Sequence, residues 1–279
     1  MTQIQIGSDL SYQVNGTTVF LFQICAANTQ HQRVISEALN FNPLLNVEHC
    51  HVGLDGIRMQ RILVEPCELH VSYRATVEMT PGIERPTEVG ECSAAQLPAE
   101  ILPYLNPSRY CESDLLGRFA FEEFGQLPRG FQRVKAICDW VFNHLEYTPG
   151  STMATTTASD VLLQRTGVCR DYAHLAITLC RGVGIPARYV SGYAVDLQPP
   201  DFHGFIEAYL DGQWFLLDPT RLVSVQGLVR IGAGRDAADV AFSTITGDAR
   251  FKSKSVWANS MNEPPGYGQD EDNAAVSLA

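Results

Sequence analysis

The dipeptide Asp211-Gly212 separates two alternating apolar runs, which is a strong short-range signal for a β-hairpin. If these two residues form the loop, Leu210 faces Gln213 across the hairpin. In that register, His203 and Asp218 lie on the same face, diagonally offset, with their backbones roughly 7–8 Å apart. A four-residue loop would keep this arrangement, and a three-residue loop would break it. The hairpin therefore predicts that an imidazole and a carboxylate lie within reach of each other.

Upstream of the hairpin, a mostly apolar helix is expected over residues 169–182, because Gly182, Gly184 and Pro186 end the pattern. Such a helix is usually buried on several sides. Its first residue is Cys169, which follows a glycine turn. The positive end of a helix dipole favours a thiolate, and the free backbone N–H groups there can stabilise an oxyanion.

Cys169, His203 and Asp218 together have the chemistry of an activated thiol nucleophile. Cys169 would attack a carbonyl carbon, His203 would exchange the proton, and Asp218 would orient the imidazole and stabilise its charge. The expected resting state is an ion pair of thiolate and imidazolium. Asp201 is a weaker candidate for orienting His203, since it lies two residues away on the same strand. Tyr147 is conceivable as an oxyanion-hole side chain, although a core aromatic at a helix end is the simpler interpretation.

The composition limits the class of protein. With 279 residues, 45% of them hydrophobic and 18% charged, the chain has an ordinary globular composition and is long enough for one large domain or two ordinary ones. Its net charge of −11 argues against nucleic acid or anionic lipid as partners. No apolar run reaches the roughly 18 residues of a membrane span, and no secretory signal is visible, so a cytoplasmic location is expected. The eight cysteines have no framework spacing and are expected to be reduced.

Three segments are expected along the chain. Residues 1–105 read as a strand-rich β domain, in which Leu69, Val71, Tyr73, Ala75 and Val77 share one face of a strand. Residues 106–250 read as the catalytic domain, and residues 251–279 as an extended tail, disordered past about residue 262. Within the catalytic domain, helices are predicted after a cap at Ser113 or Asp114, over 131–145, after Thr157 and over 169–182, and strands over 187–195, 203–210 and 213–218.

The run His49-Cys50-His51 is a candidate metal site, since both histidines would share one face of a strand. A third ligand is not identifiable and the spacing is not that of a zinc site, so no metal is expected. The chain also lacks an His-Glu-x-x-His motif, a Walker loop and a dinucleotide-binding glycine fingerprint. Metalloprotease, nucleotide hydrolase and dehydrogenase activities have no support, and no cofactor is expected.

Several blocks resemble the transglutaminase-like superfamily, a circularly rearranged relative of the papain-like cysteine peptidases. They are Thr166-Gly-Val-Cys169-Arg-Asp-Tyr-Ala-His, Gly184-Ile-Pro-Ala-Arg-Tyr-Val-Ser-Gly-Tyr193, Asp201-Phe-His203 and Leu217-Asp218-Pro-Thr. Flanking blocks at residues 106–114 and 234–241, and the strand-rich N-terminus, are similar to the bacterial branch. The resemblance implies an α+β fold, with a nucleophile helix packed on an antiparallel sheet after a small antiparallel β domain. It also implies a catalytic triad of Cys169, His203 and Asp218.

The superfamily that the sequence resembles includes transglutaminases, peptidases, amidases and inactive proteins. The expected activity is therefore acyl transfer on a peptide or protein amide through a thioester, with water as the default acceptor, as in a cysteine protease or amidase. Transamidation and a non-catalytic peptide- or protein-binding module are the alternatives. Two departures from the family pattern lie beside the triad and bear on substrate preference: Gly204 replaces the common alanine, and Arg221 the usual asparagine. The sequence leaves the oligomeric state open.

Overall fold

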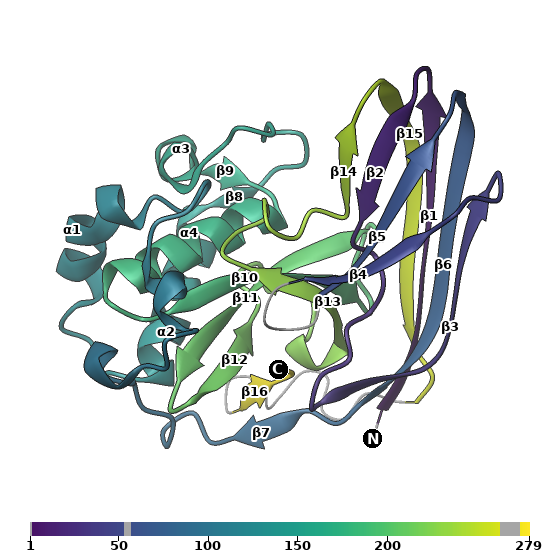
Figure 1. Cartoon of the computed structure of the whole chain (residues 1–279). Helices are drawn as coiled ribbons and strands as arrows, with labels where there is room; N and C mark the ends of the chain where they lie inside the picture. The colour runs from purple at the N-terminus through teal and green to yellow at the C-terminus, as the bar shows by residue number, and fades with distance from the viewer. Residues whose placement is uncertain (1, 53–56, 263–273) are drawn as a thin grey trace.

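The structure is a computed structural model that describes residues 2–52, 57–262 and 274–279. It has the predicted α+β fold and three layers: a group of helices, a central antiparallel sheet and a β sandwich (Figure 1). The α-helices are α1 (Ser113–Phe124), α2 (Phe131–His144), α3 (Ala158–Gln164) and α4 (Cys169–Gly182). Short 3₁₀ turns lie at Ala94–Gln96, Leu102–Leu105 and Val225–Gly227.

The β sandwich consists of two four-stranded sheets, and strands from early and late in the sequence contribute to it. One sheet has the order β15-β1-β6-β3 and the other β14-β2-β5-β4. The strands are β1 (Thr2–Val14), β2 (Thr18–Phe22), β3 (Gln32–Asn42), β4 (Glu48–Val52), β5 (Ile57–Val64), β6 (Cys67–Met79), β14 (Ser243–Thr246) and β15 (Ala249–Ser260). Tyr12 of β1 contacts Phe20 of β2 across the sandwich, with ring centroids 5.1 Å apart. The alternating face predicted for residues 69–77 is confirmed, since all five of its apolar side chains are buried.

The central sheet has six antiparallel strands in the order β13-β10-β11-β12-β16-β7. They are β7 (Gly82–Glu84), β10 (Ala187–Ala194), β11 (Phe202–Leu210), β12 (Gln213–Leu217), β13 (Leu228–Gly234) and β16 (Ala275–Ser277). Every residue of β10 is buried, because the sheet is covered on both faces. Ile206 and Ala208 pack in the core formed with the helices, whereas Val190 and Phe205 pack in the core shared with the sandwich. The central sheet therefore has a separate apolar core on each of its faces, and the sandwich shares one of them.

The predicted hairpin is confirmed. Leu210 pairs with Gln213, and the ladder continues to Ile206 opposite Leu217. Asp211 and Gly212 have φ values of 46° and 84°, so both loop residues are left-handed, as a two-residue type I′ turn requires.

The helix predictions hold closely. Helix α4 begins at Cys169 and ends at Gly182, as predicted. Thr157 caps α3, because its hydroxyl accepts the Asp160 N–H while the Asp160 carboxylate accepts the Thr157 N–H. Helix α1 differs slightly, since its N-cap is Glu112 rather than Ser113 or Asp114.

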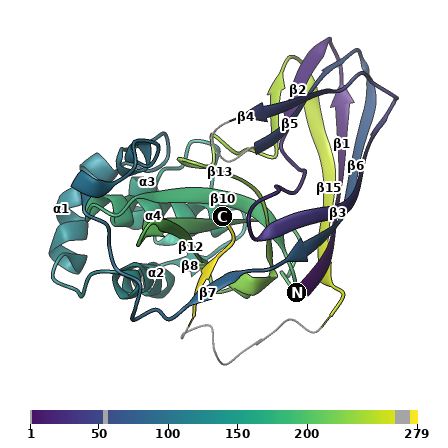
Figure 2. The ribbon, with the colours of Figure 1, turned by 60° about the horizontal axis from the view of Figure 1, so that its bottom comes forward.

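The prediction of a tail from residue 251 is wrong. Strand β15 pairs with β1 along nearly its whole length and forms an edge of the sandwich. Beyond residue 262 the expectation of disorder falls in part on residues 263–273, which lie outside the described residues. The last described segment is ordered: β16 lies between β12 and β7, and Val276 and Leu278 are buried. Figure 2 shows this segment beside β7 and β12.

All eight cysteines are free thiols. Among the described residues, no helix is both long enough and apolar enough to cross a membrane.

Candidate active site

The start of α4 is fixed by a short parallel strand pair and a buried carboxylate. Strand β9 (Thr166–Gly167) pairs with β8 (Glu146–Tyr147), which follows α2. The Asp171 side chain is fully buried and accepts the Val168 N–H at 2.8 Å. A Cβ on Gly167 would lie 2.8 Å from the Asp171 Cβ, so only glycine lets the loop pass this close. This packing places Cys169 at the first helical position, partly exposed to solvent.

The structure brings His203 and Asp218 together. The Nε2 atom of His203 lies 2.9 Å from Oδ2 of Asp218, and both side chains are buried. The second carboxylate oxygen accepts the Thr220 N–H at 2.9 Å and the Thr220 hydroxyl at 2.7 Å. The carboxylate is therefore held in place while it orients the imidazole.

The other ring nitrogen of His203 is not held by Asp218. Nδ1 is buried and has no partner with full hydrogen-bond geometry among the described residues, but the ring interacts with the Cys169 thiol. Catalytic hydrogen bonds often tighten only when substrate binds. Burial lowers the pKa of His203, and the charge and hydrogen bond of Asp218, together with Cys169, outweigh it and raise that pKa to about 10. The arrangement favours an imidazolium beside the sulfur.

Asp201, the weaker candidate, does not contact the imidazole. Its Oδ1 accepts the Phe202 N–H at 2.7 Å, and its Oδ2 forms an ion pair with Lys254 of β15 at 2.6 Å. The orienting carboxylate in the structure is that of Asp218.

Tyr147 lies next to Cys169 and is partly exposed, so its interpretation as a core aromatic is wrong. Its residue is 38% exposed, and its phenol interacts with both the backbone N–H and the thiol of Cys169. Pairing of Tyr147 with Gly167 brings it there, and sequence alone cannot reveal a two-residue parallel pair. The only signal was an aromatic residue shortly before the nucleophile segment.

The structure explains why a glycine, rather than an alanine, follows His203. A Cβ on Gly204 would lie 2.1 Å from the hydroxyl of Tyr189, which is buried beneath the site. Tyr189 therefore fills the space that an alanine methyl would need. Sequence reasoning missed Tyr189, because the contact joins two neighbouring strands diagonally.

Arg221, the second departure, has φ = 53° and so adopts the left-handed region in which asparagine is common. Its guanidinium forms an ion pair with Asp139 and lies 4.3 Å from the ring centre of Phe142, both on α2. These contacts offset the backbone strain and tie the loop after Asp218 to a helix.

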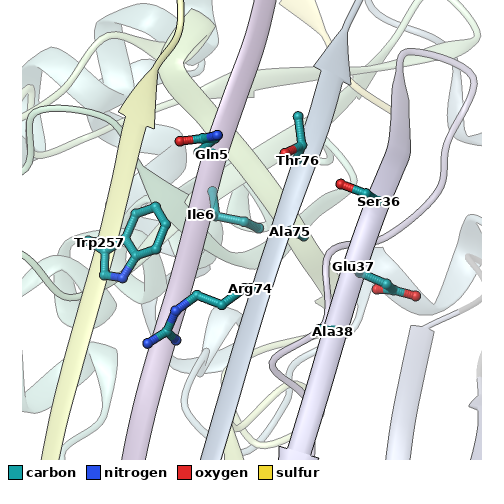
Figure 3. A pocket seen from close by; sticks show the side chains of 9 residues that line it. All are labelled: Gln5, Ile6, Ser36, Glu37, Ala38, Arg74, Ala75, Thr76 and Trp257. Carbon is teal, nitrogen blue, oxygen red and sulfur yellow. The ribbon is translucent and has the colours of Figure 1, made fainter.

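The remaining candidates lie outside the site. His49, Cys50 and His51 lie on strand β4 at a sheet edge, and the described residues contain no cluster of three or more groups suited to a metal ion. A cavity of about 360 Å³ opens on the outer face of the sheet β15-β1-β6-β3, where it is lined by Trp257, Arg74 and seven other residues (Figure 3). None of these nine residues belongs to the triad.

Comparisons with known proteins agree with this arrangement. The sequence profile of the Transglutaminase-like superfamily matches residues 121–219, and that of the Bacterial transglutaminase, N-terminal domain, matches residues 2–100. A crystal structure from Cytophaga hutchinsonii, described as a "Putative Cysteine Protease", is 39% identical, with a TM-score of 0.94 over 99% of this chain and 97% of that chain.

Two curated relatives are uncharacterised mycobacterial proteins. That of Mycobacterium leprae is 38% identical over 120 residues, which are 39% of this chain and 42% of that protein. That of Mycobacterium tuberculosis strain H37Rv is 34% identical over 154 residues, which are 49% of this chain and 48% of that protein. The matches thus span less than half the length of these relatives.

A cysteine at the start of a buried helix, facing a His–Asp pair on an antiparallel sheet, defines the α+β class to which papain-like thiol enzymes belong. Within that class, the chain belongs to the transglutaminase-like superfamily and carries the N-terminal β domain of its bacterial branch.

Proposed function

We propose that this protein is a cysteine-dependent acyl-transfer enzyme that acts on peptide or protein amides, most simply a protease or amidase. The observation that carries the proposal is the alignment of Cys169 with a buried His203–Asp218 pair whose imidazole favours the protonated form. Membership of a family that includes proteases supports the same reaction class. A cytoplasmic location and independence of nucleic acid and membrane are parts of the proposal.

The proposed reaction has two halves. The Cys169 thiolate adds to the carbonyl carbon, a C–S bond forms, and the π electrons move to the oxygen. When the carbonyl re-forms, the C–N bond breaks and the leaving amine takes the proton of His203. The neutral imidazole then removes a proton from water, the hydroxide adds to the thioester, and the acid leaves with the thiolate restored. Asp218 stabilises the imidazolium in both halves.

Hydrolysis is preferred over transamidation because transamidation needs a site that excludes water in favour of an amine. Cys169 is partly exposed and its neighbour Tyr147 is 38% exposed, so water has access to the sulfur. A primary amine added to the assay distinguishes the two reactions, since a transamidase converts most of the acyl group to the new amide, whereas a hydrolase forms mainly the acid.

The first test measures the pH dependence of iodoacetamide alkylation, with the labelled cysteine located by mass spectrometry. Rapid labelling of Cys169 that persists below about pH 6, and is lost in His203→Ala, is the expected result. Cys180, which is fully buried at the other end of α4, is an internal control that should react slowly. Labelling that begins only near the free-thiol pKa of about 8.5 would favour the non-catalytic binding module instead.

Cys169→Ala should abolish turnover of fluorescein-labelled casein and acylation by p-nitrophenyl acetate, while the thermal midpoint and circular dichroism stay unchanged. Cys138→Ala is a matched control, because this buried α2 thiol lies outside the triad. Turnover that survives in Cys169→Ala would contradict the proposal.

A further inference from the structure

The backbone of Tyr147 is fixed, and its side chain is partly exposed to solvent. The Glu146 N–H donates to Arg165 O and the Thr148 N–H to Gly167 O, each at 2.9 Å, so strand β8 is bound on both sides of Tyr147. The tyrosine residue is 38% exposed, and its ring lies beside that of Tyr172 with centroids 5.9 Å apart. The phenol is therefore attached to a fixed backbone, while part of the side chain faces solvent.

Two hydrogen-bond donors converge beside the Cys169 sulfur. The first is the backbone N–H of Cys169, which donates to no backbone carbonyl within the described residues because it lies in the first turn of α4. The second is the Tyr147 phenol, which approaches both this N–H and the thiol. In the resting structure the phenol oxygen thus lies next to the place that a substrate carbonyl oxygen must occupy.

The phenol keeps its proton under physiological conditions. Burial, together with the charge of the neighbouring Cys169, raises the pKa of Tyr147. A neutral phenol can donate to a developing oxyanion, which a phenolate could not do.

We propose that Tyr147 is a catalytic residue whose phenol O–H completes the oxyanion hole together with the backbone N–H of Cys169. The inference rests on the proposed acyl transfer and assigns the side chain that the triad alone does not supply. When the thiolate adds to the carbonyl, the oxygen gains the electron pair and receives both hydrogen bonds. These bonds are strongest in the tetrahedral intermediate, so they lower the barrier rather than tighten substrate binding.

The test compares two reactions at the same sulfur. Acylation by p-nitrophenyl acetate passes through an oxyanion, whereas alkylation by iodoacetamide displaces iodide and forms none. Tyr147→Phe should slow acylation about 10²-fold, mainly in the rate constant at saturation, and leave alkylation within about twofold. Tyr147→Gln, which restores an N–H donor, should recover part of the acylation rate.

Tyr172→Phe is the matched control, since it removes a neighbouring phenol that donates to Leu145 O rather than facing the sulfur. Both rates should stay near wild type in this variant. Equal acylation by wild type and Tyr147→Phe, or an equal loss of acylation and alkylation, would overturn the role of Tyr147. A wild-type protein that is alkylated rapidly but never acylated would overturn the proposed function and this role with it.

Discussion

At the scale of single residues, the neighbours of the triad depend on one another. Gly204 follows His203 in β11, and its missing Cβ leaves room for the Tyr189 hydroxyl from β10. Tyr189 in turn lies against His174 of α4, with ring centroids 5.3 Å apart. The glycine is therefore matched to a tyrosine that packs between the sheet and the nucleophile helix.

This match predicts the effect of Gly204→Ala. The methyl group would clash with Tyr189, so the free energy of unfolding should fall by roughly 1–3 kcal/mol. Tyr189→Phe removes the hydroxyl that the methyl meets first, and should recover part of the loss in the double variant. Urea denaturation of the four proteins gives the coupling free energy. Strictly additive effects would show that the two residues do not interact.

A second prediction at this scale concerns pH. The folded-state pKa of His203 is about 10, above its ordinary value of 6.5, so the folded protein holds a proton that the unfolded chain releases. The resulting stabilisation is complete below about pH 6.5 and is lost as the pH rises to about 10. In Asp218→Asn the raised pKa should fall, because the carboxylate charge is gone.

The measurement is the difference in unfolding free energy between wild type and Asp218→Asn from pH 6 to pH 10. The difference should shrink steadily as the pH rises. Comparison with Asp211→Asn, in the exposed hairpin loop, separates this effect from a general loss of one negative charge. A difference independent of pH would mean that the pair does not hold the proton.

At the scale of elements, the position of Cys169 depends on how α4 begins. The Asp171 carboxylate accepts the Val168 N–H and is itself held by Arg170. The same N3 carboxylate contact occurs at α3, where Asp160 accepts the Thr157 N–H. The described residues thus contain two versions of one capping contact, and that at α4 lies beside Cys169.

Asp171→Ala should destabilise the protein by roughly 1–2 kcal/mol and slow the alkylation of Cys169, because Val168 and the helix start lose their anchor. Asp160→Ala should cost stability while leaving the alkylation rate unchanged. Thermal unfolding and iodoacetamide kinetics measure the two effects. Unchanged alkylation in Asp171→Ala would mean that the loop holds its geometry without the cap.

At the scale of the whole molecule, the sheets are closed by strands from late in the sequence. Strands β14 and β15 complete the two sheets of the sandwich, and β16 lies inside the central sheet. Val276 pairs with Leu216 on one side and with Ile83 on the other. These strands hold the catalytic sheet and the sandwich to a common core.

Val276→Asp should therefore be strongly destabilising, by roughly 3 kcal/mol or more, because it buries a charge in the core. Ile83→Asp is the control, since this residue pairs with Val276 but is 56% exposed, and it should cost less than about 1 kcal/mol. Thermal midpoints measure both. Equal effects would argue against an ordered β16.

The parts of this fold that sequence predicts are those with strong local signals. Asp211-Gly212 sets the hairpin register, the glycines around α4 set its bounds, and Thr157 sets the start of α3. These features also place the triad, because its geometry depends on one turn and one helix start.

The parts that sequence misses depend on distant partners. Strand β15 has one buried residue, Val256, and a run of lysines and serines. Its composition is therefore typical of a solvated tail. Such polar, lysine-bearing strands are typical of sheet edges. Its order comes from backbone hydrogen bonds to β1, and Tyr147 likewise reaches Cys169 only through pairing of β8 with β9. No local pattern encodes either pairing.

The late position of β14 and β15 has a consequence for biosynthesis. Strands β1 and β2 are synthesised long before β15 and β14, their partners at those edges, because the four described α-helices and most of the central sheet lie between them in the sequence. During translation these two strands present unpaired backbone groups, a state that invites aggregation and engagement by chaperones. The sandwich is thus completed only after most of the central sheet has been made, and the central sheet itself waits for β16.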